Sequence, residues 1–385
     1  MRRWIALALI AIAIVAAGFS LLEPAETGEV SASAIIPEVS SDTAGFSRAV
    51  EPYDWQFPQD YGAHPEFQTE WWYYTGNLAD ENGRHFGFQF TIFRRAISPN
   101  VIDSASEWRS NQLYMAHFAI TDVDGGQYFH EQRFSREGAN LAGAECTPRC
   151  TVWVENWVTS ALDDESIQTQ ISAAGTGYAL NLNLTQIKPP ALQGDNGLSA
   201  KSDEPGNASY YYSLTRLLSE GTITIGDQAF EVTGFTWMDH EFSTSALGSN
   251  ARGWDWFGLQ LDDNRELMLG QIRLNDGGID PNFGGILVQP DGTTHTLSAS
   301  AMSIQSTATW TSPHSGAVYP AGWEISVDIG EDEPLRLQLT PLLADQELYG
   351  GGITYWEGAV RISGDAAGYG YAELTGYVDS MTGRF

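Results

Sequence analysis

Short runs rich in aromatic and β-branched residues, separated by turn-forming residues, constrain the fold more than any other feature of the sequence. From about residue 50 onward, runs such as Glu70 to Leu78, Phe86 to Phe93 and Trp254 to Leu261 are divided by turns such as Asp124-Gly125-Gly126. Alternation with a period of two is typical of antiparallel strands, and helical periodicity is hard to find. So many short strands predict an all-β protein of closed or nearly closed up-and-down barrels, which can enclose an apolar ligand.

Composition agrees with an aromatic-rich β protein. The 385 residues include 40 Gly, 13 Trp, 16 Tyr and 17 Phe, and the chain is long enough for two compact domains. The formal net charge is −30. This charge argues against a nucleic-acid partner, because nucleic-acid binding needs clustered Lys and Arg.

A faint internal repeat indicates two barrels of similar build. The sequence Phe86-Gly87-Phe88-Gln89-Phe90 returns as Phe257-Gly258-Leu259-Gln260-Leu261. We therefore predict two tandem antiparallel β-barrels, over residues 51–235 and 236–385. The stretch from Lys188 to Asn207, rich in Pro, Gly, Asp and Ser, is predicted to be a long surface loop of the first barrel.

The N-terminal residues are predicted to direct the protein out of the cytoplasm. Two arginines precede an apolar stretch from Trp4 to Phe19, which is the layout of an export signal. Val15 and Ala17 form a Val-x-Ala cleavage signal, yet the stretch extended to Leu22 approaches the roughly 20 residues that span a bilayer. Residues 1–22 are therefore a signal peptide or an N-terminal anchor, and residues 23–50 a flexible leader. The expected location is periplasmic or secreted, with a tether to the inner membrane as the alternative.

The two cysteines, Cys146 and Cys150, are separated by Thr-Pro-Arg. In an oxidising compartment, a disulfide that closes this tight turn explains the pair most simply. The sequence has no His-x-His, no His-Glu-x-x-His and no acidic calcium loop, so we predict no bound metal. The sequence also lacks dinucleotide and phosphate-binding motifs, and we predict no cofactor.

Acidic residues recur inside the most aromatic strands, where an ionised carboxylate is costly unless it is paired or used. Side chains alternate between the two faces of a strand. In Glu70-Trp71-Trp72-Tyr73-Tyr74, alternation therefore places Glu70 on one face with Trp72 and Tyr74.

The densest cluster of titratable groups lies in Trp237 to Phe242. Trp237, Asp239 and Glu241 share one face, and His240 points to the other. A carboxyl whose pKa is raised by an apolar wall and a neighbouring like charge can act as a general acid near neutral pH. Asp239 with Glu241 is the best such pair. The alternative is that these acids cap turns, accept hydrogen bonds or neutralise buried arginines.

Two later strands carry similar patterns. Asp255 is predicted to share a face with Phe257, whereas Trp254 and Trp256 point to the opposite side. Tyr355 and Glu357 share one face of a strand near the end. His117 lies in mid-strand beside small residues, as a core histidine does, and the remaining histidines are predicted to be bystanders in loops: His64, His85, His130, His295 and His314.

Six motifs, taken in order, resemble one protein family. They are Glu-Trp-Trp-Tyr-Tyr-Thr-Gly-Asn-Leu at 70–78, Ala-His-Phe-Ala-Ile-Thr-Asp at 116–122, Thr-Trp-Met-Asp-His-Glu-Phe at 236–242, Gly-Trp-Asp-Trp-Phe-Gly-Leu-Gln-Leu at 253–261, Tyr-Trp-Glu-Gly-Ala-Val at 355–360 and Glu-Leu-Thr-Gly-Tyr at 373–377. Together they resemble the lipocalin-like family of bacterial predicted secreted hydrolases of the AttH type, which is related to the carotenoid 1,2-hydratases.

The resemblance implies two lipocalin-like barrels, a cavity between or within them, and cofactor-free chemistry on an apolar, isoprenoid-like small molecule. The residues implied to reach the cavity are Glu70, Trp72, Tyr74, His117, Trp237, Asp239, Glu241, Trp254, Asp255 and Trp256, and we add Tyr355 and Glu357 as ligand-binding candidates. Asp239 is the expected proton donor, Glu241 or His240 tunes it or positions water, and Asp255 is a further catalytic candidate. Alternation does not place Asp239 and His240 on the same side unless a bulge intervenes.

Three functions remain open from the sequence. The first is an exported enzyme that hydrates or hydrolyses a hydrophobic substrate by acid and base catalysis. The second is a carrier that holds a lipid-like ligand without changing it. The third is a membrane-tethered accessory protein of an export system, for which a polar, collapsed cavity would be expected.

Overall fold

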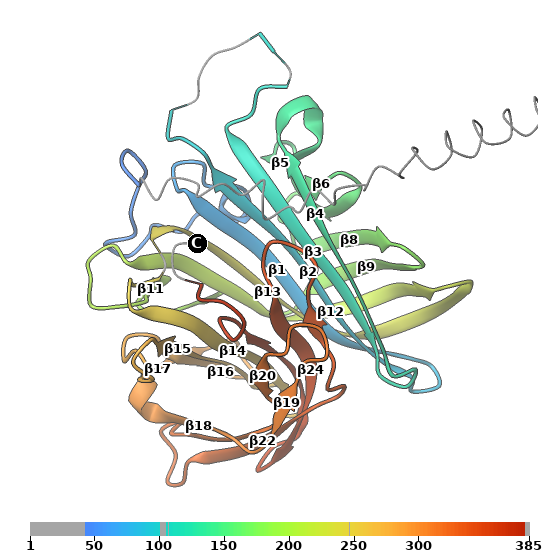
Figure 1. Ribbon diagram of the computed structural model, residues 1–385, viewed down its shortest axis with the longest axis vertical. Coiled ribbons are helices and arrows are strands. Elements are labelled where there is room, and N and C mark those ends of the chain that lie inside the picture. The colour runs from blue at the N-terminus through green and yellow to red at the C-terminus, as the bar shows by residue number, and fades with distance from the viewer. Residues whose placement is uncertain (1–42, 101–104, 107, 246, 382–385) are drawn as a thin grey trace, which may run out of the picture. The chain divides into compact units, whose positions relative to one another are not determined.

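The computed structural model describes residues 43–100, 105–106, 108–245 and 247–381, and antiparallel strands make up nearly all of its regular structure (Figure 1). The predicted all-β fold of two nearly closed antiparallel barrels is confirmed. The predicted signal or anchor, and the leader as far as residue 42, lie outside the described residues. None of the helices in the described ranges has the length and apolar character that crossing a membrane requires.

The first barrel is a sheet of thirteen strands. The last strand, β13, pairs with β12 and also with β1, so the sheet turns back on its own beginning. Its open seam lies between β4 and β5, which end the order β4-β3-β2-β1-β13-β12-β9-β8-β7-β6-β5, with β10 and β11 paired to β12. The strands are β1 (Thr69–Asp80), β2 (His85–Ala96), β3 (Gln112–Asp122), β4 (Gln127–Arg136), β5 (Ala142–Cys146), β6 (Cys150–Val154), β7 (Trp157–Ala161), β8 (Gln168–Gly175), β9 (Tyr178–Gln186), β10 (Ala191–Leu192), β11 (Leu198–Ala200), β12 (Ala208–Ile225) and β13 (Gln228–Ser245).

The second barrel repeats this plan with ten strands in its sheet. Its last strand, β25, pairs with its first, β14, and the seam lies between β17 and β18. Its strands, with the separate hairpin β19–β20, are β14 (Ala251–Leu261), β15 (Glu266–Leu274), β16 (Gly285–Val288), β17 (Thr294–Leu297), β18 (Met302–Ser306), β19 (Thr309–Thr311), β20 (Val318–Pro320), β21 (Trp323–Val327), β22 (Leu335–Pro341), β23 (Glu347–Leu348), β24 (Tyr355–Gly364) and β25 (Gly368–Leu374). Within the described part of the chain, three short 3-10 helices complete the elements: η2 (Gln59–Tyr61), η3 (Gly138–Asn140) and η4 (Ala299–Ala301).

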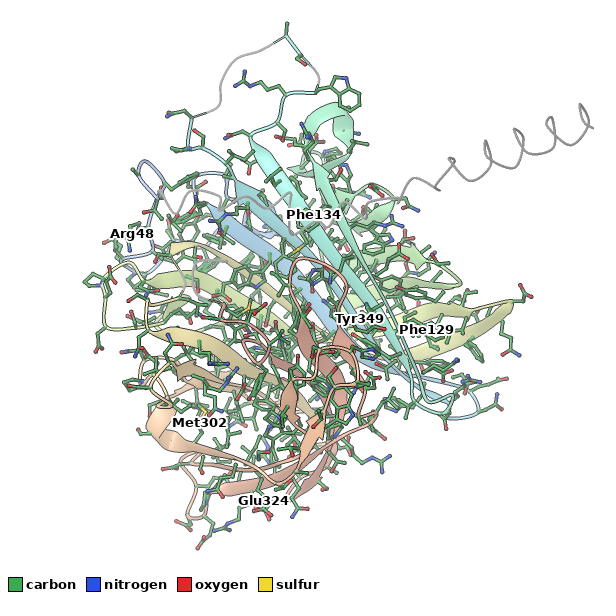
Figure 2. All side chains as sticks on the ribbon, viewed as in Figure 1. Arg48, Phe129, Phe134, Met302, Glu324 and Tyr349 are labelled. Atoms are coloured by element: carbon green, nitrogen blue, oxygen red, sulfur yellow. A yellow bond between two sulfur atoms is a disulfide. The ribbon has the colours of Figure 1, made fainter. Side chains whose placement is uncertain are left out.

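Side chains fill the interiors of both barrels (Figure 2). Aromatic residues such as Phe88 and Trp157 pack the first interior, and Trp323 packs the second. A third apolar cluster draws on both sheets, with Tyr73 from β1 and Trp256 from β14 among its members. The two barrels therefore meet through an aromatic layer as well as having cores of their own.

The internal repeat found in the sequence has the same structural role in both barrels. Phe88 of β2 and Leu259 of β14 each lie in the core of their own barrel. The glycine between the apolar residues faces the other barrel: a Cβ on Gly87 would lie 2.8 Å from Cβ of Ala359, closer than two such atoms approach. The repeat thus combines an apolar face for the barrel interior with a small residue where the barrels meet.

The predicted domain boundary at residue 235 falls inside β13. Residues 232–243 of this strand pair with β1, and the second sheet starts only at Ala251. The change of sheet therefore comes after Ser245, because the last strand of the first barrel has to return to β1 to close it.

The prediction that Lys188 to Asn207 forms an exposed surface loop is wrong for the two lysines of this stretch, which are buried. Short strands β10 and β11 tie this stretch to β12. Lys188 is 8% exposed and its Nζ lies 2.7 Å from Oε2 of Glu266 in the second sheet, and Lys201 is 5% exposed. Polar composition suggested a loop, but these lysines neutralise buried carboxylates.

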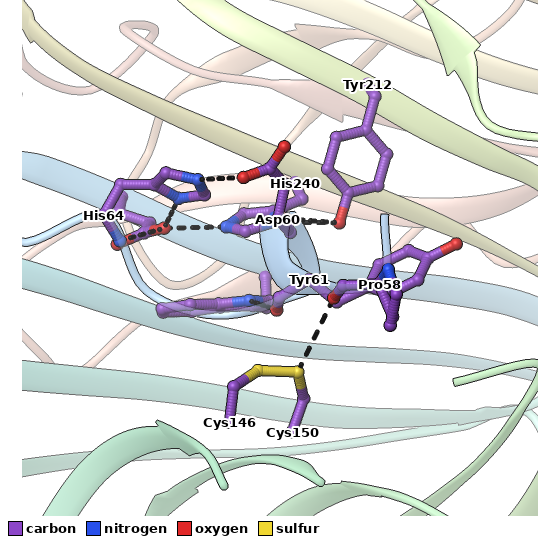
Figure 3. The surroundings of a disulfide bond; sticks show 10 residues. Pro58, Asp60, Tyr61, His64, Cys146, Cys150, Tyr212 and His240 are labelled. Carbon is purple, nitrogen blue, oxygen red and sulfur yellow. Dashed lines mark hydrogen bonds and ion pairs between the residues drawn. A yellow bond between two sulfur atoms is a disulfide. The ribbon is translucent and has the colours of Figure 1, made fainter. Parts of the chain in front are cut away.

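The expected disulfide between Cys146 and Cys150 is present. The two residues face each other at the open end of the β5–β6 hairpin. Figure 3 shows the pair beside Pro58, whose carbonyl oxygen lies 3.9 Å from Sγ of Cys150.

Candidate active site

A pocket of about 80 Å³ lies where the two sheets face each other. A single water needs roughly 10–15 Å³ by this measure, so the space is several times larger than one water requires. The lining combines aromatic rings from both barrels with three carboxyl groups and one ammonium group. The lining residues are Trp71, Tyr73, Phe93, Lys201, Tyr211, Asp239, Glu241, Leu247, Trp254, Trp256, Ile272, Phe283, Tyr355 and Glu373.

Asp239 of β13 is the most strongly hydrogen-bonded acid of this pocket. Its Oδ1 accepts hydrogen bonds from Ser213 Oγ at 2.6 Å and Trp237 Nε1 at 2.7 Å, and its Oδ2 accepts one from Tyr211 OH at 2.6 Å. Burial raises the pKa of Asp239 to about 7, although these three donors act in the opposite direction. Asp239 therefore exchanges its proton near neutral pH.

Glu241 lies two residues further along the same face of β13. Lys201 Nζ is 3.0 Å from Glu241 Oε1, and Ser209 donates a hydrogen bond to the same oxygen. The ammonium group also lies 4.1 Å from the centroid of the Phe283 ring, a cation–π contact. Lys201 was not a candidate from the sequence, because its polar surroundings indicated a solvent-exposed loop.

Glu373 of β25 brings a third carboxyl to the pocket from the second barrel. Trp254 Nε1 donates a hydrogen bond to Glu373 Oε2 at 3.1 Å. Burial, with contributions from the charges of Asp239 and Glu241, raises the pKa of Glu373 to about 7. Sequence reasoning missed Glu373, although its motif was recognised and alternation places it on one face with Tyr371.

The aromatic wall is connected to the acids by hydrogen bonds. Trp256 Nε1 donates to Tyr211 OH at 3.2 Å, and that hydroxyl donates to Asp239. Trp254 and Trp256 both line the pocket, and Trp237 lies behind Asp239 as its hydrogen-bond donor. The tryptophan residues proposed from the sequence thus gather at one place.

His240 lies outside this pocket, on the opposite face of β13. Its Nε2 is 2.8 Å from Glu70 Oε1 and its Nδ1 is 2.9 Å from Tyr212 OH. Glu70 also contacts His64 Nδ1 at 2.8 Å and accepts a hydrogen bond from Arg94 Nε at 2.8 Å. Figure 3 shows His64, Asp60, His240 and Tyr212 around this network. His64 is therefore not the loop bystander predicted from the sequence.

The ionisation of this network follows from its partners. Burial alone would raise the pKa of Glu70, but Arg94 and the two histidines hold it well below its usual range. Burial alone would lower the pKa of His64, but Asp60 and Glu70 raise it to about 9. Burial lowers the pKa of His240. The network is thus an ion-paired group inside the first barrel.

Ligand-type atoms of His64, Glu70 and His240 lie within 4.8 Å of one another. Both imidazoles already contact one carboxylate oxygen of Glu70, and Arg94 occupies the other. The guanidinium supplies the positive charge that a metal ion would otherwise bring.

Asp255 also lies outside the pocket. It contacts Arg273 Nε at 3.0 Å, Gln271 Nε2 at 2.8 Å and Tyr377 OH at 3.1 Å. Burial raises the pKa of Asp255 despite the neighbouring Arg273. The sequence correctly placed Asp255 on the face of β14 opposite to Trp254 and Trp256. Because the two tryptophans point to the pocket, Asp255 points away from it.

Trp72 and Tyr74 face the interior of the first barrel, as alternation with Glu70 predicted. They line a separate cavity of about 40 Å³. Trp72 Nε1 donates to the carbonyl of Tyr61 at 3.1 Å, and Tyr74 OH lies 3.1 Å from Thr159 Oγ1. The face directed at the second barrel carries Trp71 and Tyr73 instead.

His117, Tyr355 and Glu357 lie together beside the pocket. His117 Nδ1 is 2.7 Å from Tyr355 OH, and Tyr355 lines the pocket. Burial lowers the pKa of His117 to about 3. Burial and the charge of Glu373 raise the pKa of Glu357 well above its usual range. At neutral pH His117 is therefore uncharged, and the shift of Glu357 favours its protonated, uncharged form.

Comparison with known proteins agrees with this architecture. A crystal structure described as an AttH from Nitrosomonas europaea is 35% identical, with a TM-score of 0.76, over 86% of this chain and 100% of that chain. Kievitone hydratase from Nectria haematococca is 13% identical, with a TM-score of 0.64, over 87% of this chain and 98% of that chain, and shares the fold. No curated protein matches the sequence. The family model named AttH-like matches residues 48–377, and the chain therefore belongs to the AttH-like family.

Proposed function

We propose that this protein is an enzyme that adds water to, or cleaves with water, an apolar small molecule held in the inter-barrel pocket. Asp239 supports this proposal most directly, because it is a buried acid with a pKa of about 7 at the wall of a pocket lined mostly by aromatic rings. A general acid works best when its pKa lies near the working pH. The aromatic lining favours an apolar substrate, for which an isoprenoid-like molecule is suitable.

Asp239 and Glu373 divide the acid and base roles in this proposal. The charge of Asp239 disfavours ionisation of Glu373, so in this proposal one of the two carboxyls is protonated while the other is ionised near neutral pH. The hydroxyl of Tyr211 donates a hydrogen bond to Asp239 and can pass a proton to it, so we assign the acid role to Asp239. Glu373, with its one indole donor, takes the role of base.

Hydration then proceeds with one proton entering and one leaving. The π electrons of a substrate double bond take the proton of Asp239 and form a C–H bond, which leaves a cation on the other carbon. The faces of Trp254 and Trp256 stabilise that cation. Water forms a C–O bond with it, and the released proton passes to Glu373. In a hydrolysis, the proton of Asp239 goes to the leaving oxygen while water attacks.

A hydratase with the same fold supports the choice of a water-consuming reaction. Kievitone hydratase shares this architecture over most of the chain. The accessory-protein alternative called for a polar, collapsed cavity, whereas the pocket is mainly aromatic. We also propose export to the periplasm or beyond, which the disulfide between Cys146 and Cys150 supports.

Native mass spectrometry of the protein purified from its own envelope tests the proposal. We expect a bound apolar molecule, and a product heavier by one water or split by one water after incubation. The Asp239→Asn variant should retain the unreacted molecule. A wild-type protein that holds the molecule unchanged through the same incubation would identify a carrier instead.

A further inference from the structure

Buried polar atoms without a hydrogen-bond partner gather beside the pocket. Among the described residues, most such atoms lie on β1 to β4, β24 and β25. They are Tyr73 OH, Thr75 Oγ1, Gln89 Oε1, Arg95 Nε, His117 Nε2, Tyr128 OH, Gln132 Oε1, Tyr371 OH and both carboxyl oxygens of Glu357. Buried polar groups in folded proteins are nearly always hydrogen-bonded to protein or to ordered water. A cluster of this size therefore indicates bound water.

Glu357 is the centre of this cluster. Tyr73 of β1 and Tyr355 of β24 lie against its carboxyl group without a hydrogen bond of regular geometry. Tyr371 and Tyr128 also lie within its electrostatic reach. An unpartnered buried carboxyl is costly, and one bridging water offers it both a donor and an acceptor.

The cluster is continuous with the pocket by two routes. Glu357 lies directly opposite Glu373 in the β24–β25 pairing, and Glu373 lines the pocket. Tyr355 also lines the pocket, and its hydroxyl lies 2.7 Å from His117 Nδ1 and 3.4 Å from Gln89 Nε2. Groups that can pass a proton therefore extend from the pocket wall into the contact between the barrels.

The charge state of the cluster fits water better than an ion. The protonated form of Glu357 is favoured because burial and the charge of Glu373 raise its pKa well above its usual range. His117 stays neutral because burial lowers its pKa to about 3. The tyrosine hydroxyls are protonated as well, since burial raises their pKa values. Neutral donors and acceptors bind water, whereas divalent cations are usually bound with ionised carboxylates among their ligands.

We propose that Tyr73, Gln89, His117, Tyr355, Glu357 and Tyr371 form an inter-barrel water site, which stores water for the reaction in the pocket and returns its proton to solvent. The two roles in the reaction, storing water and returning its proton, rest on the proposed function. In each turnover one stored water gives its oxygen and one hydrogen to the product. Its other proton goes to Glu373 and leaves through Glu357 and the neighbouring waters. Asp239, which gave its proton to the substrate, takes one proton back from solvent, so that both acids return to their starting states and no oxidant or further reactant is needed.

High-resolution diffraction of the wild-type protein tests the water site without a substrate. We expect ordered water within hydrogen-bond distance of Glu357 and Tyr73, and fewer waters in Glu357→Leu. Glu357→Gln should fold normally, because an amide replaces a neutral carboxyl of the same shape, and should keep water in place. A dry site, with Glu357 bonded directly to the hydroxyls of Tyr73 and Tyr355, would overturn the proposal.

Infrared spectroscopy in H2O and D2O gives an independent reading. A protonated Glu357 in contact with exchangeable water should give a carboxyl band that shifts in D2O and disappears in Glu357→Gln. Glu347→Gln is the matched control, because Glu347 is equally buried but accepts hydrogen bonds from Ser312, Ser315 and Tyr319. This control should keep the band. A band that does not shift would contradict the water site.

Turnover measurements separate this proposal from the proposed function. If both proposals hold, Glu357→Gln lowers kcat by roughly tenfold or more, up to the roughly 10²- to 10⁴-fold that general acid–base catalysis contributes, and leaves KM unchanged. Glu347→Gln should leave both unchanged. An active protein in which Glu357→Gln has no effect would refute the relay. If Asp239→Asn has no effect on turnover, the proposed function fails while diffraction still decides the water site.

Discussion

Asp239 and Glu241, two residues apart on β13, line the same pocket in opposite electrostatic surroundings. The donors to Asp239 are neutral: a serine, a tyrosine and a tryptophan. Glu241 instead lies 3.0 Å from the ammonium group of Lys201. Neutral donors leave burial to raise the pKa of Asp239, whereas Glu241 is paired with a cation.

Replacing Asp239 by Asn should abolish most turnover without loss of binding. General acid catalysis contributes roughly 10²- to 10⁴-fold, so we expect kcat to fall by about that factor. Binding should persist because the aromatic wall is unchanged. The matched control is Asp255→Asn, a buried aspartate directed away from the pocket. A variant pair with the reverse result, inactive Asp255→Asn and active Asp239→Asn, would assign the acid role to Asp255.

The pH dependence of kcat/KM should reveal the same acid. Because Asp239 has to be protonated to donate, and its pKa is about 7, activity should fall as pH rises through about 7. The residual activity of Asp239→Asn should show no such fall with rising pH. Steady-state rates across neutral pH check this expectation. A profile that stays flat through neutrality would exclude Asp239 as the titrating acid.

Stability should decrease between about pH 4 and pH 7. The pKa of Asp239 rises from 3.8 to about 7 on folding and that of Glu373 from 4.5 to about 7. In this window the folded state binds more protons than the unfolded state, so the free energy of unfolding declines as pH rises. Thermal unfolding measured over this range should show the decline, and the double variant Asp239→Asn with Glu373→Gln should show a weaker one. An equal slope in both proteins would contradict the raised pKa values.

Strand alternation could be read from the sequence, and it placed several site residues correctly. Asp239 and Glu241 share the pocket face, and His240 takes the other, because successive side chains on a strand must point to opposite sides. The same rule separated Trp256 from Asp255. Nothing in this rule says which face meets the other barrel, and for that reason Asp255 and His240 were expected at the site.

The remaining site residues depend on contacts between distant segments. Lys201 meets Glu241 because β10 and β11 hold its loop against β12. Glu373 reaches the pocket only through the closure of the second barrel by β25. Such pairings join residues far apart in sequence, and no local pattern encodes them.

The disulfide should contribute to stability and leave the chemistry unchanged. Cys146 and Cys150 are four residues apart, and the chain-entropy model gives about 2 kcal/mol for so short a loop. Neither cysteine lines the inter-barrel pocket. The double variant Cys146→Ser with Cys150→Ser should therefore lose up to about 2 kcal/mol in denaturant unfolding and keep wild-type kcat. Loss of activity at full folding would show that the turn acts on the pocket.

The buried network around Glu70 should matter for folding more than for catalysis. Glu70 is fully buried and pairs with Arg94 at 2.8 Å. Breaking such a pair leaves an uncompensated buried charge, which costs about 3–5 kcal/mol, so Glu70→Gln should lower the free energy of unfolding by roughly that amount. The matched control is Glu131→Gln, whose partly exposed pair with Arg133 spans 3.7 Å and should contribute less than about 1 kcal/mol. Denaturant unfolding of both variants measures the difference. If Glu70→Gln lowered the free energy of unfolding no more than Glu131→Gln does, Arg94 would have to find another partner when Glu70 loses its charge.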